Sequence, residues 1–170
     1  MAIDECQSSF KKLAEQTLPS LMKEMERALS RAMQMSIFAK KGVGKKTILK
    51  TLKKKSDFQG CYVLNDENGP LYVGISRGVI QRLIQHVKGR THFDASFAYR
   101  IASENYEHEM SRGDAMNHEE FKTYFYDAKK YISGMSVAFI EIANDLELYL
   151  FEVYCSMELD TSLWNTFRTH

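Results

Sequence analysis

Five side chains suited to phosphate chemistry follow one another along the 170-residue chain: Tyr62, Tyr72, Arg82, His86 and Glu147. Hydrolysis of a phosphodiester needs an activated water, charge neutralisation at phosphorus and help for the leaving oxygen. A guanidinium offers a phosphate a planar fork of donors that a lysine does not reproduce. A phenol or an imidazole can move protons, and a carboxylate can hold a divalent cation. The five residues therefore contain the groups that such a reaction requires.

Spacing places two of these residues on one helix face, and phenol chemistry suggests the roles of the two tyrosines. Arg82 and His86 are four residues apart, so on a helix they share one face. Our hypothesis makes Tyr62 the general base, aided by His86, while Tyr72 orients the water or the phosphate. A free phenol has a pKa of about 10, so this role requires a neighbouring cation or metal to lower the pKa.

Glu147 is the predicted ligand of Mg²⁺ or Mn²⁺. Mg²⁺ binds proteins through one or two carboxylates and fills its other positions with water and phosphate oxygens, so a single helical glutamate suffices. Two other carboxylates compete for this role, namely Glu152 in the same predicted helix and Glu141 in the strand before it.

The two tyrosines belong to a predicted β-hairpin. Residues 59–65 (QGCYVLN) and 70–76 (PLYVGIS) have strand composition, and the DENG segment between them supplies a tight turn that ends in glycine. Because side chains alternate along a strand, Cys61 and Val73 are expected to point to the core, opposite the tyrosines.

The arginine and the histidine fall on a predicted amphipathic helix over residues 78–88, which Gly89 ends. The rest of the chain is expected to form two helical pieces, a third strand and a last helix: 94–105, 118–132, 135–142, and Asn144 or Asp145 to about Met157.

Before the hairpin, apolar residues recur at helical spacing from Phe10 to Met33. Pro19 is expected to divide this stretch, because proline is tolerated in the first turn of a helix but not in its interior. A second short helix is expected over 45–55. The apolar face has two alternatives, packing on the domain or forming a homodimer. The methionines of this region are expected in the core: Met22, Met25, Met33 and Met35.

The net charge of +1 conceals an uneven distribution. Residues 1–58 hold 13 Lys+Arg and 6 Asp+Glu, a balance of +7, whereas residues 59–170 hold 10 and 16, a balance of −6. Residues 39–56 contain eight lysines and no acid. Such a run attracts a polyanion, although a solvated surface is the alternative interpretation. The predicted nucleic-acid contacts are Lys45, Lys46, Lys50, Lys53, Lys54 and Lys55.

Composition limits the class of protein. With 44% apolar and 12% aromatic residues, the chain can bury a core of one compact domain with an extension. We find no segment of ~20 apolar residues for a membrane span and no secretory signal at the start. Cys6, Cys61 and Cys155 are odd in number and far apart in sequence, without a disulfide framework or paired zinc ligands. We therefore expect a cytoplasmic protein without membrane contact.

Taken in order, these features resemble the GIY-YIG nuclease family. The resemblance covers about residues 59–165, and the stretch from 88 to 133 is less diagnostic. Cysteine and valine replace the two isoleucines of the family motifs, and the interval from the glutamate to the late asparagine is longer than usual. The residues that carry the resemblance are Gly60-Cys61-Tyr62, Tyr72-Val73-Gly74, Arg82, His86, Glu147 and Asn165.

The resemblance implies an α/β (α+β) domain over 59–170, with a small three-stranded antiparallel sheet flanked by helices and a helical insert at about 89–133. A helical, lysine-rich arm over 1–58 would precede it. The implied activity is that of a divalent-metal-dependent DNA endonuclease using Mg²⁺ or Mn²⁺, with RNA not excluded. Gly60, Gly74 and Asn165 would support the site. The alternative is a catalytically silent module on the same fold that binds nucleic acid or a protein partner.

Overall fold

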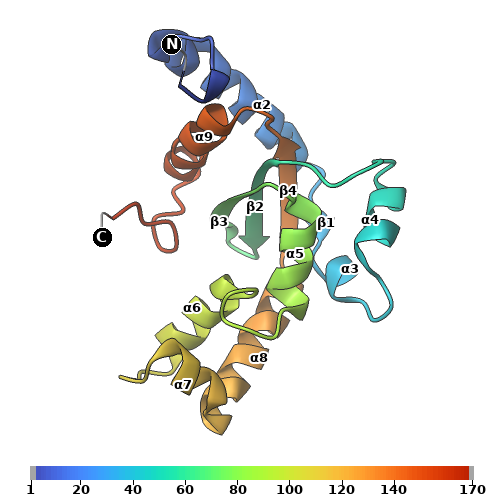
Figure 1. Cartoon of the computed structure of the whole chain (residues 1–170), viewed down its shortest axis with the longest axis vertical. Helices are drawn as coiled ribbons and strands as arrows, with labels where there is room; N and C mark the ends of the chain where they lie inside the picture. The colour runs from blue at the N-terminus through green and yellow to red at the C-terminus, as the bar shows by residue number, and fades with distance from the viewer. Residues whose placement is uncertain (1–2, 169–170) are drawn as a thin grey trace. The chain divides into compact units, whose positions relative to one another are not determined.

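The computed structural model describes residues 3–168 as a mixed α+β fold (Figure 1). After a 3-10 turn at Ile3–Glu5, the elements in chain order are α1 Phe10–Lys12, a π-helical turn Leu13–Thr17, α2 Leu18–Leu29, β1 Met33–Gln34, α3 Ser36–Ala39, α4 Lys45–Thr51, β2 Gly60–Asp66, β3 Gly69–Ser76, α5 Val79–Lys88, α6 Ser96–Asn105, α7 Arg112–Asn117, α8 Glu119–Ser133, β4 Ser136–Glu141 and α9 Asp145–Glu158. None of the helices within residues 3–168 combines the length and apolar character needed to cross a bilayer.

The sheet is antiparallel and has four strands in the order β1-β4-β2-β3. The predicted hairpin and third strand are present as β2, β3 and β4, with β2 paired to both of the others. The expectation of three strands is wrong because β1 adds a fourth. β1 has two residues, Met33 and Gln34, which is too short for an alternating pattern to be visible in the sequence.

The chain forms two compact units. The sheet unit holds residues 3–33, 58–79 and 136–168, and the helical unit holds residues 34–57 and 80–135. This division differs from the expected boundary at residue 58. Residues 3–33 belong with the sheet because α2 packs on β4 and α9, whereas the lysine-rich segment belongs to the helical unit.

The core of the sheet unit lies between one face of the sheet and helices α2 and α9. Cys61 and Val73 are fully buried there, as predicted, and Met22 and Met25 of α2 are buried beside them. The apolar face of α2 therefore packs on its own domain. Cys61 also lies against Cys155, which is distant in sequence; burial, a hydrogen bond with Cys155 and the charge of Glu152 all raise the pKa of the Cys61 thiol.

Pro19 does not divide the N-terminal helical stretch. The chain stays helical from Phe10 to Leu29, and the π-helical turn Leu13–Thr17 lies directly before the proline. Pro19 therefore lies in the first turn of α2, directly after the π-helical turn, where the regular α-helical hydrogen bonding changes.

The hairpin turn and a close strand approach set the register of β2. Gly69 has a φ of +119°, which favours glycine, and the Asn68 N–H donates to Asp66 Oδ1 at 2.8 Å. At the other end of β2, Gly60 lies so near the Ile140 carbonyl of β4 that a Cβ at this position would collide with it. Gly60 thus permits the pairing of β2 with β4.

The substitution Gly60→Ala should therefore destabilise the protein, by about 3 kcal/mol, because the obstacle is backbone and cannot rotate away. Urea unfolding of both proteins measures the difference. Gly113→Ala in α7 is the matched control, since a Cβ there is free of close contacts and favours helix. Equal losses in the two variants, or none in the first, would contradict the role given to Gly60.

Candidate functional site

Tyr62 and Tyr72 lie on the same face of the hairpin, opposite the core face. In the register, Tyr62 pairs with Gly74 and Leu64 pairs with Tyr72, so alternation puts all of these residues on one side. The centroids of the two phenol rings are 6.3 Å apart. Tyr62 is 1% exposed and Tyr72 is half-buried. The predicted convergence of the two tyrosines is present within the sheet unit.

Gly74 leaves room for the Tyr62 phenol. A Cβ on Gly74 would collide with the far end of the Tyr62 ring, including its hydroxyl oxygen. The ring therefore crosses β3 at a position that requires glycine. This contact explains why the position opposite Tyr62 on β3 is a glycine.

Asn165 holds the middle residue of the second tripeptide. Its Oδ1 accepts a hydrogen bond from the Val73 N–H at 2.9 Å, and its Nδ2 donates to the Val73 carbonyl at 2.8 Å. β3 is an edge strand, so these backbone groups would otherwise face away from the sheet without a strand partner. The amide thus extends the ladder by one residue, which is a supporting role.

Arg82 and His86 lie one turn apart on α5, in the helical unit. Arg82 Nη1 donates to the Asp94 carbonyl at 2.9 Å, and Nη2 donates to Ser96 Oγ at 2.6 Å. These bonds join α5 to the start of α6. Each uses one donor of a guanidinium that has five N–H groups.

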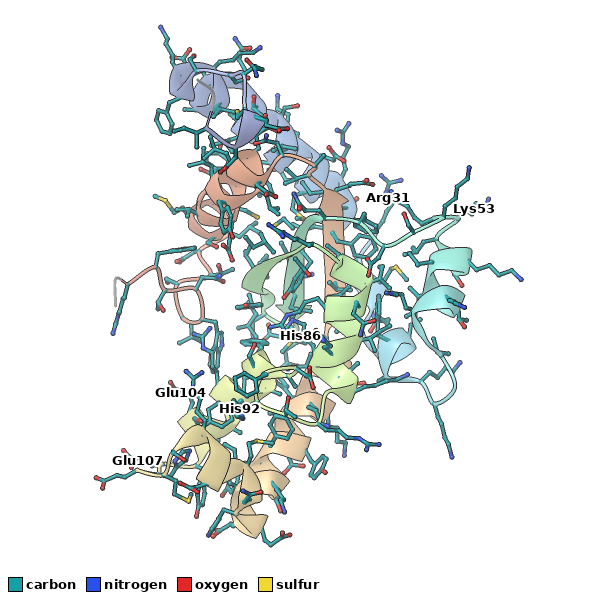
Figure 2. All side chains as sticks on the ribbon, in the orientation of Figure 1. Arg31, Lys53, His86, His92, Glu104 and Glu107 are labelled. Carbon is teal, nitrogen blue, oxygen red and sulfur yellow. The ribbon has the colours of Figure 1, made fainter. Side chains whose placement is uncertain are left out.

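His86, which is labelled in Figure 2, is 0% exposed. Its ring lies edge-on to the Phe97 ring, with the two centroids 6.2 Å apart. Burial, and then the charge of Arg82, lower the pKa of His86 to about 3. At neutral pH the imidazole is therefore uncharged. It is a weak base there and adds no positive charge to the site.

Glu147 lies in the first turn of α9, where its N–H bonds to the Asn144 cap at 3.0 Å. It is half-buried. The core stripe of α9 is formed by Leu148, Phe151 and Cys155, which pack on the sheet face that carries Val73. The helix thus covers the face opposite the two tyrosines. The structure does not bring Glu147 onto the tyrosine face.

The competing carboxylates of the sheet unit have different surroundings. Glu152 of α9 is half-buried, and burial raises the pKa of its carboxyl group. Glu141 ends β4 and is exposed.

Glu147 would bind a metal without other protein ligands gathered around it. Within the described residues, no group of three or more His, Cys, Asp or Glu side chains gathers as a metal centre. Mg²⁺ held mainly by water and substrate phosphate does not need such a group. Glu147 is half-exposed, so its carboxylate fits a ligand of this kind.

The six predicted lysine contacts are all exposed in and after α4: Lys45, Lys46, Lys50, Lys53, Lys54 and Lys55. Ile48 and Leu49 bury the opposite side of this helix. The loop before α4 is fixed by Lys88, whose Nζ donates to the carbonyls of Lys40 and Val43. The lysines thus form a solvated face, as both interpretations of the run require.

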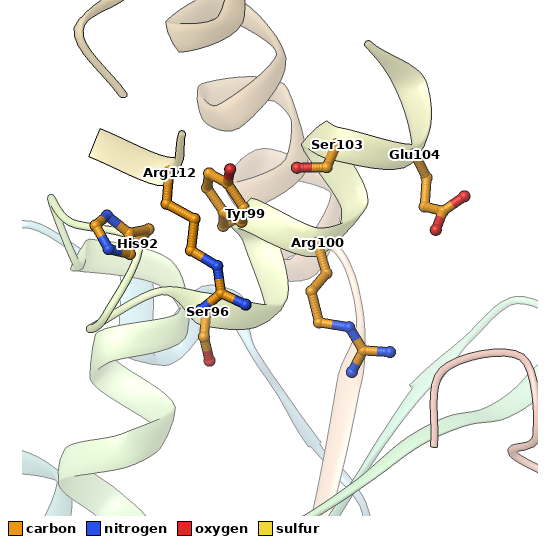
Figure 3. Close-up of a pocket in the computed structure, with 7 residues that line it drawn as sticks. All are labelled: His92, Ser96, Tyr99, Arg100, Ser103, Glu104 and Arg112. Atoms are coloured by element: carbon orange, nitrogen blue, oxygen red, sulfur yellow. The ribbon is translucent and has the colours of Figure 1, made fainter. Parts of the chain in front are cut away.

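Sequence analysis missed a polar pocket in the helical unit (Figure 3). Seven side chains of α6 and its neighbouring segments line it: His92, Ser96, Tyr99, Arg100, Ser103, Glu104 and Arg112. The spacing of Ser96, Arg100 and Ser103, at i, i+4 and i+7, is the one available sign in the sequence that these polar groups share a helix face. Arg112 comes from the start of α7, a helix that the periodicity did not predict.

Comparison with known proteins identifies no relative, since no family model, no curated protein and no solved structure matches the chain.

The low pKa of His86 predicts a loss of stability in acid. The unfolded chain binds a proton on this histidine near pH 6.5 and the folded chain near pH 3, so stability falls as the pH falls between these values. We expect a decrease of about 2 kcal/mol between pH 6.5 and pH 5 from this residue. Urea unfolding at several pH values measures it.

The variant His86→Leu should show a flatter dependence of stability on pH, whereas His92→Leu, at a half-buried position, should keep the wild-type slope. An unchanged slope in His86→Leu would contradict the assignment of the acid sensitivity to this imidazole.

Proposed function

We propose that the protein is a divalent-metal-dependent endonuclease of the GIY-YIG type that hydrolyses phosphodiester bonds of DNA. The observation that carries the proposal is the mutual contact of the family residues within the sheet unit. The Tyr62 phenol fills the space above Gly74, Tyr72 packs beside it, and Asn165 holds Val73.

In the proposed mechanism Tyr62 takes the proton of the attacking water and Tyr72 orients the water or the phosphate. His86 does not aid the base, contrary to the initial hypothesis, because an imidazole with a pKa of about 3 is too weak a base to take the proton of a phenol at neutral pH. Arg82 retains three N–H groups beyond its bonds to Asp94 and Ser96, enough for a forked contact with a phosphate.

Glu147 would hold Mg²⁺ or Mn²⁺, an ion that supplies charge stabilisation to phosphoryl oxygens, on the side of the sheet that α9 covers and not beside the tyrosines. The role of Glu147 is a separate claim from the role of the tyrosines, because α9 covers the opposite face of the sheet. The two claims therefore need separate variants.

Charge distribution supports nucleic acid as the substrate. By the division into units, the helical unit carries 16 Lys+Arg and 9 Asp+Glu, a balance of +7, and the sheet unit carries 7 and 13, a balance of −6. A negatively charged sheet unit repels a polyanion, so we assign the non-specific grip to the lysines of the helical unit.

Nicking of supercoiled plasmid, with Mg²⁺ and with chelator, tests the activity. Tyr62→Phe keeps the ring packing and removes the hydroxyl, so we expect the rate to fall by about 10²–10⁴-fold. Tyr149→Phe, an exposed position on α9, is the matched control and should nick as wild type. Wild-type nicking by Tyr62→Phe would contradict the role of the base.

Glu147→Gln in the same assay tests the metal role, with loss of nicking expected. Undiminished nicking by this variant would end the proposal for Glu147 and leave that for Tyr62 intact.

The second candidate function is a nucleic-acid-binding module that cleaves nothing. The contacts of Arg82 with Asp94 and Ser96, and the complete burial of His86, favour it, because both side chains also serve to pack the helical unit. Binding of DNA or RNA without cleavage of either, in Mg²⁺ or Mn²⁺, would support the module over the enzyme.

Reversing the charge of Lys53, Lys54 and Lys55 to glutamate should weaken DNA binding at least tenfold and flatten its dependence on salt. Fluorescence anisotropy with labelled duplex at several salt concentrations, in chelator, measures both quantities. The same triple reversal at Lys11, Lys12 and Lys23 is the control, because these lysines are exposed in the sheet unit. If the two triple variants weaken binding equally, the net charge of the protein governs binding and the lysines in and after α4 have no special role.

A further inference from the structure

We propose that the polar pocket of the helical unit is a nucleic-acid subsite, in which a backbone phosphate of one strand binds between Arg100 and Arg112 while a base stacks on Phe93. The pocket is distinct from the proposed catalytic residues. The proposal takes its class of ligand, a nucleic acid, from the proposed function.

The pocket has the size for a phosphate group. Its volume is about 180 Å³, several times the ~30 Å³ that one water occupies in the liquid. All seven lining residues lie between 92 and 112, within one compact unit.

The charges of the pocket favour an anion. Two guanidinium groups face one carboxylate, that of Glu104, which is exposed. Figure 3 shows the guanidinium groups of Arg100 and Arg112 extending to the same side of α6 as the Ser96 hydroxyl, with Glu104 at the other end of the row. Arg112 also lies over the Tyr99 ring, with Cζ 5.9 Å from the centroid, which restrains its direction. Paired arginines are the usual recognition element for a phosphate.

Two hydroxyls are ready to donate to such an anion. Ser96 Oγ accepts a hydrogen bond from Arg82 at 2.6 Å, which leaves the hydroxyl proton of Ser96 available to a ligand oxygen. Ser103 Oγ is buried and has no hydrogen-bond partner among the described residues. An unpaired buried hydroxyl is destabilising, and a ligand oxygen at this position would satisfy it.

An aromatic row at the pocket identifies the ligand as nucleic acid instead of free phosphate. Phe93 is 76% exposed, its ring centroid lies 4.0 Å from that of His92, and His92 lies 5.7 Å from Tyr99 inside the pocket. A large exposed aromatic side chain beside a phosphate-sized pocket is the arrangement by which proteins stack the bases of a single strand while holding its backbone.

The test is anisotropy of a short fluorescein-labelled single-stranded DNA in chelator, where no cleavage occurs. Arg112→Gln should weaken binding about tenfold and reduce the salt slope by about 0.7, the value for one phosphate contact on a single strand. Phe93→Ala should weaken binding at least fivefold without changing the salt slope. Arg90→Gln, the same substitution at an exposed arginine outside the pocket, should change the affinity by less than twofold.

Wild-type affinity in both Arg112→Gln and Phe93→Ala would overturn the subsite. Calorimetry with inorganic phosphate adds a second arm: if Arg112→Gln abolishes phosphate binding while its DNA affinity is unchanged, the pocket takes a free anion and the proposal is wrong. Because binding is measured without metal, the subsite stands if these variants weaken binding in a protein that nicks no plasmid. If the protein nicks plasmid normally and Arg112→Gln and Phe93→Ala leave binding unaffected, the subsite is wrong and the proposed function stands.

Discussion

The candidate site depends on one steric fit, the Tyr62 phenol lying across the Cα of Gly74. The fit exists in a single register of the hairpin, because a shift of one residue would move every side chain of β2 to the other face and place Tyr62 in the core. The turn that ends at Gly69 and the close approach of β4 to Gly60 both fix that register. The glycines and tyrosines of the two tripeptides are thus parts of one packing arrangement.

The edge of the sheet imposes the next constraint. β3 has a strand neighbour on one side, so the N–H and carbonyl of Val73 point outwards, as expected for the non-hydrogen-bonded pair that it forms with Val63. Asn165 satisfies both groups with one side-chain amide. The C-terminal segment is thereby tied to the strand that carries Tyr72, and it covers part of an edge that would otherwise be available to another chain.

The elements that the sequence predicted correctly are those determined by interactions between residues close together in the chain. The hairpin, the third strand and the last helix follow from alternation, turn residues and a capping asparagine, and each was predicted within a few residues of its observed bounds. The bond between Asn165 and Val73 spans 92 residues and has no periodicity to reveal it. The face covered by α9, which separates Glu147 from the tyrosines, depends equally on tertiary packing. The pocket around Arg100 needs the fold of the helical unit, since Arg112 joins it from a helix whose sequence has no clear apolar period.

Arg82 is both a proposed phosphate ligand and a packing residue of the helical unit, so the effect of substituting it has more than one possible cause. Its bonds to Asp94 and Ser96 position the start of α6, and Ser96 is itself a wall of the proposed phosphate pocket. Removal of Arg82 would therefore alter fold, binding and any catalysis together, and a lost activity would not distinguish them. The Tyr62 hydroxyl is different, because phenylalanine preserves the ring that packs over Gly74. Chemistry and structure can thus be separated at the phenol but not at the guanidinium.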